Sequence, residues 1–355
     1  MAQGLTTSDN QPQAWPLRLG RLALRGLARM AWLLAWLWVI GAAWYSELGP
    51  TFLPILMATA VAIGFPLAWY RWKNTRRRTA LVFLATFLLA LGLWTLKRPK
   101  TDAYWVAELA QAPTISLEGD QLTIEGLRDC VYRTKGDFDL RYRIETYDLA
   151  QLETLDLLVE RFHPWNALAH TLLTFGFSDG RHVVISVEVR REIGESFDPI
   201  AGLFRQLELM YVLGTESDLI GLRTNFRKSH AWLYPIRTTK ERIRKLFRSM
   251  LARAKHLQTS PEFYNTLTST CTTNIVDHVL DLAPDRFDPD WRVLLPGYVA
   301  TLAYEAGLID TDLSFDAMQE AFRIDDIAQA GPVDTVYSQR IRSGRPARVT
   351  GEPPR

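Results

Sequence analysis

The sequence predicts an α+β domain with an antiparallel sheet, preceded by three transmembrane helices. Its first hundred residues contain three long apolar stretches, and the rest alternates between strand-like segments of period two and segments with helical spacing. The charge changes at the same place. Residues 1–100 carry 12 Lys and Arg against two acidic residues, whereas the remainder carries 29 basic and 37 acidic residues. The net charge of +2 is therefore the average of two unlike parts.

The three apolar stretches cover residues 27–45, 51–70 and 79–96. Each is close to the ~20 residues that cross a ~30 Å hydrocarbon core, and in lipid such a segment spans only as a helix. We therefore expect residues 1–100 to form a membrane module. A cleaved signal peptide is the alternative for the first stretch, but that stretch exceeds the ~7–15 apolar residues of a signal sequence and leads into two more spans.

Basic residues around the spans predict the orientation. Four arginines lie between residues 18 and 29, and five Lys or Arg residues lie between residues 71 and 78, whereas the turn at residues 46–50 has none. By the positive-inside rule, the N-terminus is cytoplasmic and the third helix exits on the far side. We expect a multi-pass protein of a bacterial inner membrane, with its main domain in the periplasm.

The extracytoplasmic domain is expected to cover residues 101–330. Residues 171–177 and 182–189 are rich in Val, Ile, Phe and Thr around a Ser-Asp-Gly turn, which predicts a hairpin. A further strand is expected at residues 219–224, and residues 149–162 fit either a helix or a strand. Helices are expected at residues 102–111, 199–213, 239–257, 272–282 and 298–306. The tail at residues 331–355 lacks apolar residues and is expected to be disordered and basic.

Composition excludes several classes of function. The larger part of the chain is acidic, which does not support nucleic-acid binding driven by charge. Two cysteines exclude a disulfide-stapled scaffold and a Cys-rich metal module, and no Gly-rich phosphate loop is present. His278 lies seven residues after Cys271 on the same helix face, but no third ligand has suitable spacing. We expect neither a metal nor a cofactor.

Cys271 is the candidate nucleophile. Polar residues precede it, and the apolar stripe of a helix begins just after it, which places the sulfur at a helix N-terminus. Unpaired amides and the helix dipole favour an anion there, so the thiol is shifted towards thiolate. The alternative is a buried structural cysteine. A disulfide with Cys130 is also possible in an oxidising compartment, and it would remove the nucleophile.

His170 and Glu188 are the candidate base and its orienting carboxylate. A three-residue hairpin loop with Gly180 in the left-handed position pairs Phe177 with Arg181 and sets His170 opposite Glu188. Glu188 could then stabilise the protonated imidazole, as the third member of a triad does. A two-residue turn would instead set Val189 opposite His170. Glu188 could equally be a surface carboxylate, or one that forms a salt bridge with Arg190 or Arg191.

Other polar residues are less informative about chemistry. Asp218 and Arg223 could form an internal ion pair on neighbouring turns, with a structural role.

Three segments resemble the Lnb-type periplasmic domain family. They are the hairpin from His170-Thr-Leu-Leu-Thr-Phe-Gly-Phe-Ser-Asp-Gly to Val-Ile-Ser-Val-Glu188-Val-Arg-Arg-Glu, the stretch Pro261–Asn274, and Leu295-Pro296-Gly297. The family is similar to circularly permuted papain-like (NlpC-type) thiol enzymes, so the resemblance implies that fold over about residues 113–310. It also implies that Cys271 is the nucleophile and His170 its base.

The resemblance further implies an activity, because named members of the family are bacterial lipoprotein N-acyltransferases. A membrane-anchored cysteine enzyme of this kind would move an acyl group from a phospholipid through a Cys thioester to an amine of a lipoprotein or peptide. Two departures are evident. The family often has Asn before the cysteine, where this chain has Thr270, and its best-known acyltransferases carry membrane helices after the domain. A thiol hydrolase of the same fold (amidase, peptidase or lipase) and a non-catalytic anchored module for envelope assembly or binding are the alternatives.

Overall fold

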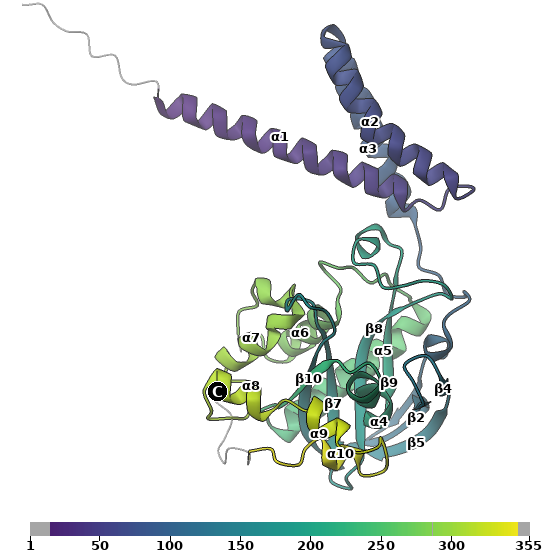
Figure 1. Ribbon diagram of the computed structural model, residues 1–355, viewed down its shortest axis with the longest axis vertical. Helices are drawn as coiled ribbons and strands as arrows, with labels where there is room; N and C mark the ends of the chain where they lie inside the picture. The colour runs from purple at the N-terminus through teal and green to yellow at the C-terminus, as the bar shows by residue number, and fades with distance from the viewer. Residues whose placement is uncertain (1–14, 286, 347–355) are drawn as a thin grey trace, which may run out of the picture. The chain divides into compact units, whose positions relative to one another are not determined.

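The structure is a computed structural model that describes residues 15–285 and 287–346 and divides the chain into two compact units, Met1–Lys97 and Arg98–Arg355 (Figure 1). The first 14 residues of the expected membrane module, and residues 347–355 of the expected tail, lie outside the described residues. The predicted class, an α+β domain after three apolar helices, is confirmed.

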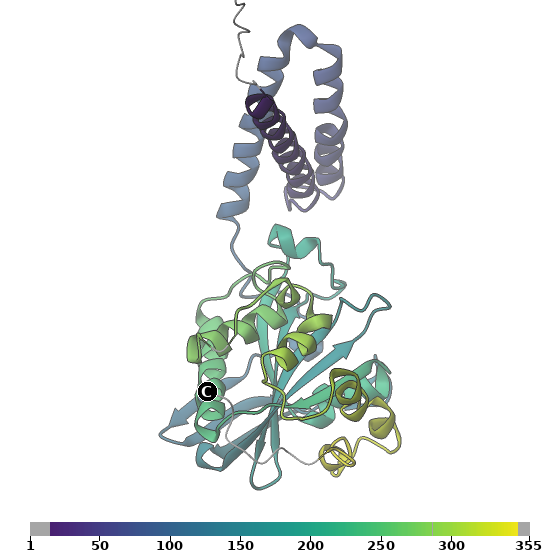
Figure 2. The ribbon, with the colours of Figure 1, turned by 90° about the vertical axis from the view of Figure 1, so that its left-hand side faces the viewer.

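The first unit consists of α1 (Trp15–Trp44), α2 (Phe52–Arg71) and α3 (Arg76–Leu96), which pack against one another (Figure 2). All three are long and apolar enough to cross a membrane. Helix α1 begins 12 residues before the predicted stretch, because the preceding residues are mostly Leu, Arg and Ala, which favour helix.

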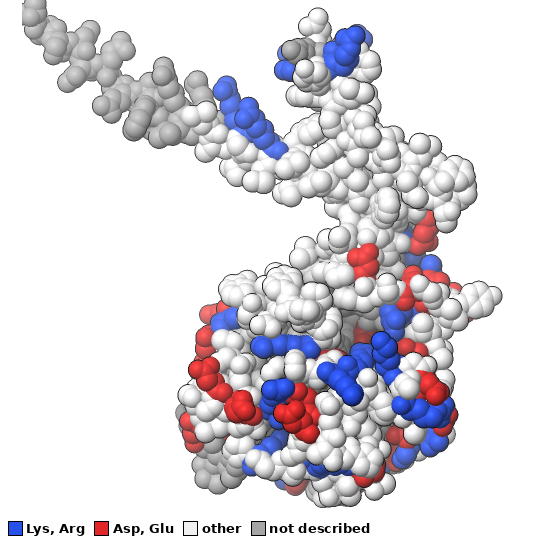
Figure 3. Space-filling model, in the orientation of Figure 1, with Lys and Arg blue, Asp and Glu red and all other residues white. Residues whose placement is uncertain are grey.

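The outer surface of this unit suits lipid contact. Val39, Val61 and Phe83 form a small core with their neighbours, but only 11–17% of each span is buried, so most apolar side chains face outwards. Figure 3 shows Lys and Arg gathered at the loop between α2 and α3 and on the early part of α1, with a largely uncharged surface between them. This distribution matches apolar spans with basic flanks.

An eight-stranded mixed sheet forms the centre of the second unit. Its order is β1-β2-β9-β8-β7-β6-β10, with β5 paired to β2, and every neighbouring pair is antiparallel except β2 and β9. The strands are β1 (Thr114–Glu118), β2 (Gln121–Arg128), β5 (Tyr142–Asp148), β6 (Leu152–Arg161), β7 (His170–Phe177), β8 (His182–Arg190), β9 (Glu208–Gly214) and β10 (His230–Pro235). A separate two-stranded sheet joins β3 (Val131–Tyr132) to β4 (Phe138–Asp139).

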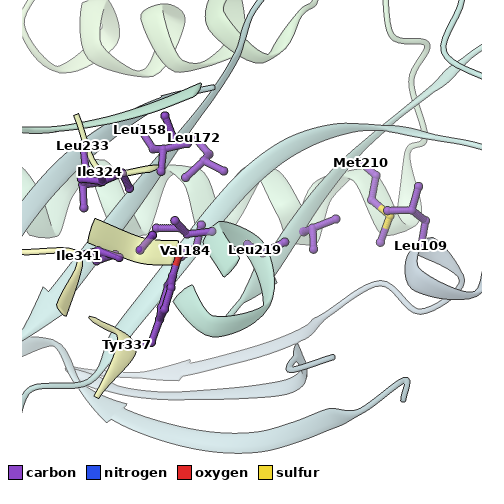
Figure 4. Packing of buried hydrophobic residues seen from close by; sticks show 14 residues of the cluster. Leu109, Leu158, Leu172, Val184, Met210, Leu219, Leu233, Ile324, Tyr337 and Ile341 are labelled. Atoms are coloured by element: carbon purple, nitrogen blue, oxygen red, sulfur yellow. The ribbon is translucent and has the colours of Figure 1, made fainter. Parts of the chain in front are cut away.

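Helices cover both faces of this sheet. Helices α5 (Lys240–Thr259) and α6 (Cys271–Leu282) pack on one face, where Phe247 stacks on Phe175 with ring centroids 4.6 Å apart. On the other face, Leu172 and Val184 belong to a buried cluster with side chains of α4 (Glu216–Gly221), α9 (Asp325–Gln329) and α10 (Tyr337–Arg340) (Figure 4). Helices α7 (Val299–Glu305) and α8 (Phe315–Ala321) complete the unit. Alternate residues of β7 thus pack into two cores, one on each face of the sheet.

Three predicted elements differ from the structure. Residues 199–213 contain only a 3₁₀ turn, Ala201–Phe204, and then strand β9, whose continuous apolar run is buried on both faces and has no strand period to reveal it. Residues 219–224 lie in α4 and its π-helical continuation Leu222–Phe226, because the Thr215 hydroxyl caps the helix at the Asp218 amide. Residues 102–111 contain only the 3₁₀ turn Ala107–Leu109, and the ambiguous segment 149–162 is mainly strand β6.

Residues 331–346 are ordered, which corrects the disorder expected for this part of the tail. Two of its apolar residues, Tyr337 and Ile341, are buried in the same core as Leu172. The Arg342 guanidinium donates to the buried carboxylates of Asp156 and Glu216 at 2.9 and 2.5 Å. Arg342 thus holds the tail to the domain by pairing with one buried carboxylate on β6 and one on α4.

Replacing Arg342 with Ala is expected to destabilise the domain by about 3 kcal/mol, because two buried carboxylates lose a charge partner. Thermal unfolding of the detergent-solubilised protein measures the change. The matched control is Lys245→Ala, which removes a pair with Glu241 whose two side chains are 59% and 70% exposed. That control should cost less than ~0.5 kcal/mol. Equal losses in the two variants would contradict this role of Arg342.

Candidate active site

The ends of four neighbouring strands meet at one edge of the sheet. Strand β6 ends at Arg161, β7 begins at His170, β8 ends at Arg190 and β9 begins at Glu208. Because these neighbours are antiparallel, those four positions share an edge. The sheet therefore gathers its connecting loops around His170.

The β7–β8 hairpin has the expected three-residue turn. Gly180 has a φ of +85°, and the Phe177 amide donates to the Arg181 carbonyl at 2.9 Å. The ladder ends at the pair of Leu172 and Ser186, and His170 and Glu188 each lie two residues beyond it on their strands. The imidazole Nε2 lies 3.3 Å from the Glu188 carboxylate. The structure therefore brings these two predicted site residues together.

Ser186 links the imidazole to the carboxylate, a contact that the sequence analysis missed. Its hydroxyl lies 2.7 Å from His170 Nε2 and donates to Glu188 Oε1 at 2.6 Å. Ser186 and Glu188 are two residues apart on one strand, so both face the same side. That spacing is the signal that could have identified Ser186.

Glu188 is also held by Arg223, whose Nη2 lies 2.7 Å from the carboxylate. Arg223 Nε lies 2.8 Å from Glu160, which is almost fully buried on β6. Burial acts to raise the pKa of Glu188, but the charges of His170 and Arg223 outweigh it and hold that pKa well below its usual value. Glu188 is thus a partly buried ion pair member and not an isolated surface carboxylate.

The expected ion pair between Asp218 and Arg223 does not form. Asp218 instead accepts two hydrogen bonds from the Arg128 guanidinium, each 2.9 Å long. Asp218 lies in α4 and Arg223 in its π-helical continuation, and five helical residues separate side chains by more than one turn. The two side chains therefore reach different partners.

Cys271 is the first residue of α6. The Thr270 hydroxyl accepts from the Thr273 amide, and the Thr273 hydroxyl accepts from the Thr270 amide, which makes a reciprocal capping box. Asn274 also donates to the Thr270 carbonyl at 2.8 Å. The cap fixes the start of the helix at the cysteine, as the sequence predicts. Thr270, where the family often has Asn, serves as this cap.

The thiol and the imidazole interact where β7 begins. Burial opposes ionisation of the thiol, but the charge of His170 and hydrogen bonds from His170 and Thr171 outweigh it and lower the pKa of Cys271. Burial acts to lower the pKa of His170, but the charges of Glu188 and Cys271 outweigh it and raise that pKa. Both shifts favour a thiolate–imidazolium pair. Since Nε2 faces Ser186 and Glu188, Nδ1 is the nitrogen available to the sulfur.

Both cysteines are free, so the alternative of a Cys130–Cys271 disulfide does not describe this structure. Cys271 is 5% exposed, and the His170 side chain is 14% exposed. Cys130 packs with Tyr132 and Leu222 in a separate cluster. Burial and the nearby Asp218 charge raise the pKa of Cys130 to about 12, so this second thiol stays protonated.

Three further residues surround the thiol. Thr272 Oγ1 lies 3.8 Å from the sulfur and 3.0 Å from Thr171 Oγ1. Burial, and then the charges of Cys271 and Glu188, raise the pKa of Tyr264, which places this phenol in the electrostatic field of the site. Sequence reasoning gave these residues no role, because threonine in strands and tyrosine in loops are common without chemistry.

Gly297 supports the loop that leads into His170. Its amide donates to the Ala167 carbonyl at 3.0 Å, and a Cβ added at this position would lie 1.7 Å from the Asn166 carbonyl oxygen. Only glycine permits this approach of two backbones. This contact explains the Leu-Pro-Gly segment in physical terms.

His278, considered above as a metal ligand, lies between the Tyr211 hydroxyl at 3.0 Å and the Ser249 hydroxyl at 2.7 Å. Burial lowers the pKa of His278 to about 4, so it is a neutral member of the α5–α6 interface. Across residues 15–285 and 287–346, no group of three or more His, Cys, Asp or Glu could hold a metal ion.

Comparison with known protein families gives a match to part of the second unit. Residues 139–297 match the family model of the Lnb N-terminal periplasmic domain, and this segment contains His170, Glu188 and Cys271. The family description is that of a periplasmic domain, and the three apolar helices make the chain a membrane protein. No curated protein and no solved structure matches the chain.

The state of the thiol predicts how alkylation depends on pH. The rate of iodoacetamide modification of Cys271 should rise with a midpoint below the ~8.5 of an ordinary thiol, because the imidazolium stabilises the thiolate. Glu188→Gln removes the carboxylate that keeps His170 protonated, so the midpoint should move to higher pH. Mass spectrometry of the modified peptide measures both rates, and Cys130 is the internal control that should stay unmodified. An unshifted midpoint in Glu188→Gln would contradict the charge coupling.

Gly297→Ala is expected to slow alkylation of Cys271 at neutral pH by at least about tenfold, because the added Cβ displaces the backbone that positions His170. The comparison is with Gly119→Ala, at a turn where an added Cβ meets nothing within 4 Å. Both variants introduce alanine, and only Gly119 has a left-handed φ, of +63°, at which alanine is strained. Backbone strain alone would therefore affect Gly119→Ala more. A larger effect at Gly119 than at Gly297 would rule out this positioning role.

Proposed function

We propose that the chain is a membrane-anchored periplasmic cysteine acyltransferase, because residues 139–297 match the family model of the Lnb N-terminal periplasmic domain. It would transfer an acyl group from a phospholipid to an amine of a lipoprotein or peptide acceptor. The observation that carries the proposal is the interaction of the Cys271 thiol with the His170 imidazole, with Glu188 behind it. The fold relationship proposed with it is to permuted papain-like thiol enzymes.

In the first step, the Cys271 thiolate attacks the carbonyl carbon of the lipid ester. The carbon–sulfur bond forms, the carbon–oxygen bond to the lysolipid breaks, and the His170 imidazolium gives its proton to the leaving oxygen. Backbone amides in the first turn of α6 and the helix dipole stabilise the oxyanion. The charge of Glu188 stabilises the imidazolium before this proton is given away.

In the second step, an amine attacks the thioester. The neutral His170 accepts a proton from the amine as the carbon–nitrogen bond forms, and the thiolate leaves with the electrons of the carbon–sulfur bond. The thiolate–imidazolium pair is restored. Water in place of the amine would give hydrolysis, so exclusion of water from the thioester decides between the two outcomes.

The surroundings of the site support a lipid as the acyl donor. Loops at the sheet edge that carries His170 leave six large apolar side chains exposed, each by between 42% and 70%. They are Phe162, Trp165, Ile193, Phe197, Ile200 and Leu267. Such a rim suits insertion into the interfacial region of a bilayer.

The chain also enters the second unit at this edge of the sheet. Helix α3 ends at Leu96, and the Lys100 amide already donates to Glu208 at the start of β9, while its ammonium pairs with Glu192 just after β8. Only residues 97–99 separate the span from this attachment. With the N-terminus in the cytoplasm, as the flanking charges predict, the domain would lie on the periplasmic side.

The test follows an acyl chain from labelled phospholipid in membranes that contain the wild type, Cys271→Ala or His170→Ala. We expect label on Cys271 and then on protein amines in the wild type, none with Cys271→Ala, and a 10²–10⁴-fold slower transfer with His170→Ala. The matched control is Cys130→Ala, which should transfer at the wild-type rate. Release of free fatty acid instead of amide would replace the transferase with a lipase, and equal labelling with Cys271→Ala would overturn thiol catalysis.

A further inference from the structure

A cavity of about 130 Å³ lies between the sheet and the helices on the α6 side. Its sheet wall is apolar and includes Leu155, Leu157 and Leu173. Its helical wall comes from α5, α6 and α7, including Ile243, Leu246, Val299 and Leu302. Two charged residues, Arg237 and Arg242, also line the cavity, and Arg237 pairs with Asp310 and Asp312 at 3.3 and 3.4 Å. The walls are therefore those of a hydrocarbon site.

The cavity adjoins the candidate active site. Thr171 and Thr272 both line it, and each follows directly after a site residue, His170 or Cys271. The two hydroxyls are 3.0 Å apart, and Thr272 Oγ1 also lies 3.8 Å from the Cys271 sulfur. One wall of the cavity is thus within contact distance of the thiol.

The cavity follows the length of α6 away from the thiol. The helix lines it at positions 272, 275, 276, 279 and 282, which is the spacing of one helical face. At ~1.5 Å per residue these positions span about 15 Å. One leaflet of a ~30 Å hydrocarbon core is about 15 Å deep, so the lined length matches one membrane acyl chain.

We propose that this cavity receives the acyl chain of the Cys271 thioester, with the carbonyl at the Thr171–Thr272 end and the chain along α6. The inference rests on the proposed function and adds the place and length of the acyl group. An apolar cavity stays dry and binds apolar ligands. A ligand that fills it restores the packing contacts that the empty cavity lacks. Enclosing the chain beside the helix N-terminus also keeps bulk water from the thioester.

The test measures acylation of Cys271 in the full-length protein in nanodiscs by p-nitrophenyl esters of acetate, butyrate, octanoate and decanoate. The burst of p-nitrophenolate gives kcat/KM for the step in which the sulfur replaces the phenolate oxygen. We expect kcat/KM to rise by up to about fourfold per buried methylene. Val279→Trp, which fills the middle of the cavity, should lower decanoyl transfer by at least about tenfold and change acetyl transfer by less than about twofold.

Two controls separate the possible failures. Asp281→Trp adds the same bulk on the exposed side of α6 and should leave the chain-length profile unchanged. If Val279→Trp lowers kcat/KM equally for all esters, Val279→Ala becomes the test of the cavity. The extra space in this variant should shift the preference towards longer acyl chains. A burst that is equal for all chain lengths, or a profile that neither Val279 variant alters, would overturn the cavity assignment and leave thiol catalysis standing. No burst with any ester would overturn the proposed function and this inference together.

Discussion

A row of alternating charges from the interior to the thiol sets the chemistry of the site. Glu160 is buried and pairs with Arg223, Arg223 pairs with Glu188, and Glu188 faces His170, which interacts with Cys271. Each member lowers the cost of burying the next. Because the members come from β6, the π-helical segment after α4, β8, β7 and α6, the row exists only when the sheet and both helical layers are assembled. Thiol reactivity is in this way a property of the whole second unit.

The parts of the site that the sequence could predict are those determined by local rules. Gly180 fixes the turn, the turn fixes the hairpin register, and the register sets His170 opposite Glu188. Polar residues followed by an apolar stripe indicate the helix that starts at Cys271. The three apolar helices follow from length and composition alone. In each case the information lies within about twenty neighbouring residues.

The parts that the sequence could not predict depend on contacts between distant segments. Ser186 gains its role from a side chain on the next strand, and Arg223 takes Glu188 and Glu160 as partners over Asp218, five residues away. The strand at residues 208–214 is buried on both faces, so its apolar run has no period to distinguish it from a helix. Thr215 is a residue type that commonly caps helices, so this residue is the sequence signal for the start of α4.

The position of the C-terminal segment has a consequence for biosynthesis. Arg342 neutralises carboxylates on β6 and α4, and Tyr337 fills the core beneath β7, yet both follow every strand of the sheet along the chain. A nascent chain that has already formed its sheet still lacks the Arg342 charge that pairs with Asp156 and Glu216, and it has a cavity where Tyr337 will pack. Contacts across some 190 positions of chain, such as that between Arg345 and Asp156, also close slowly. Maturation of the domain therefore waits until residues 337–346 have been synthesised and have reached the same compartment as the sheet, and the site is fully assembled only then.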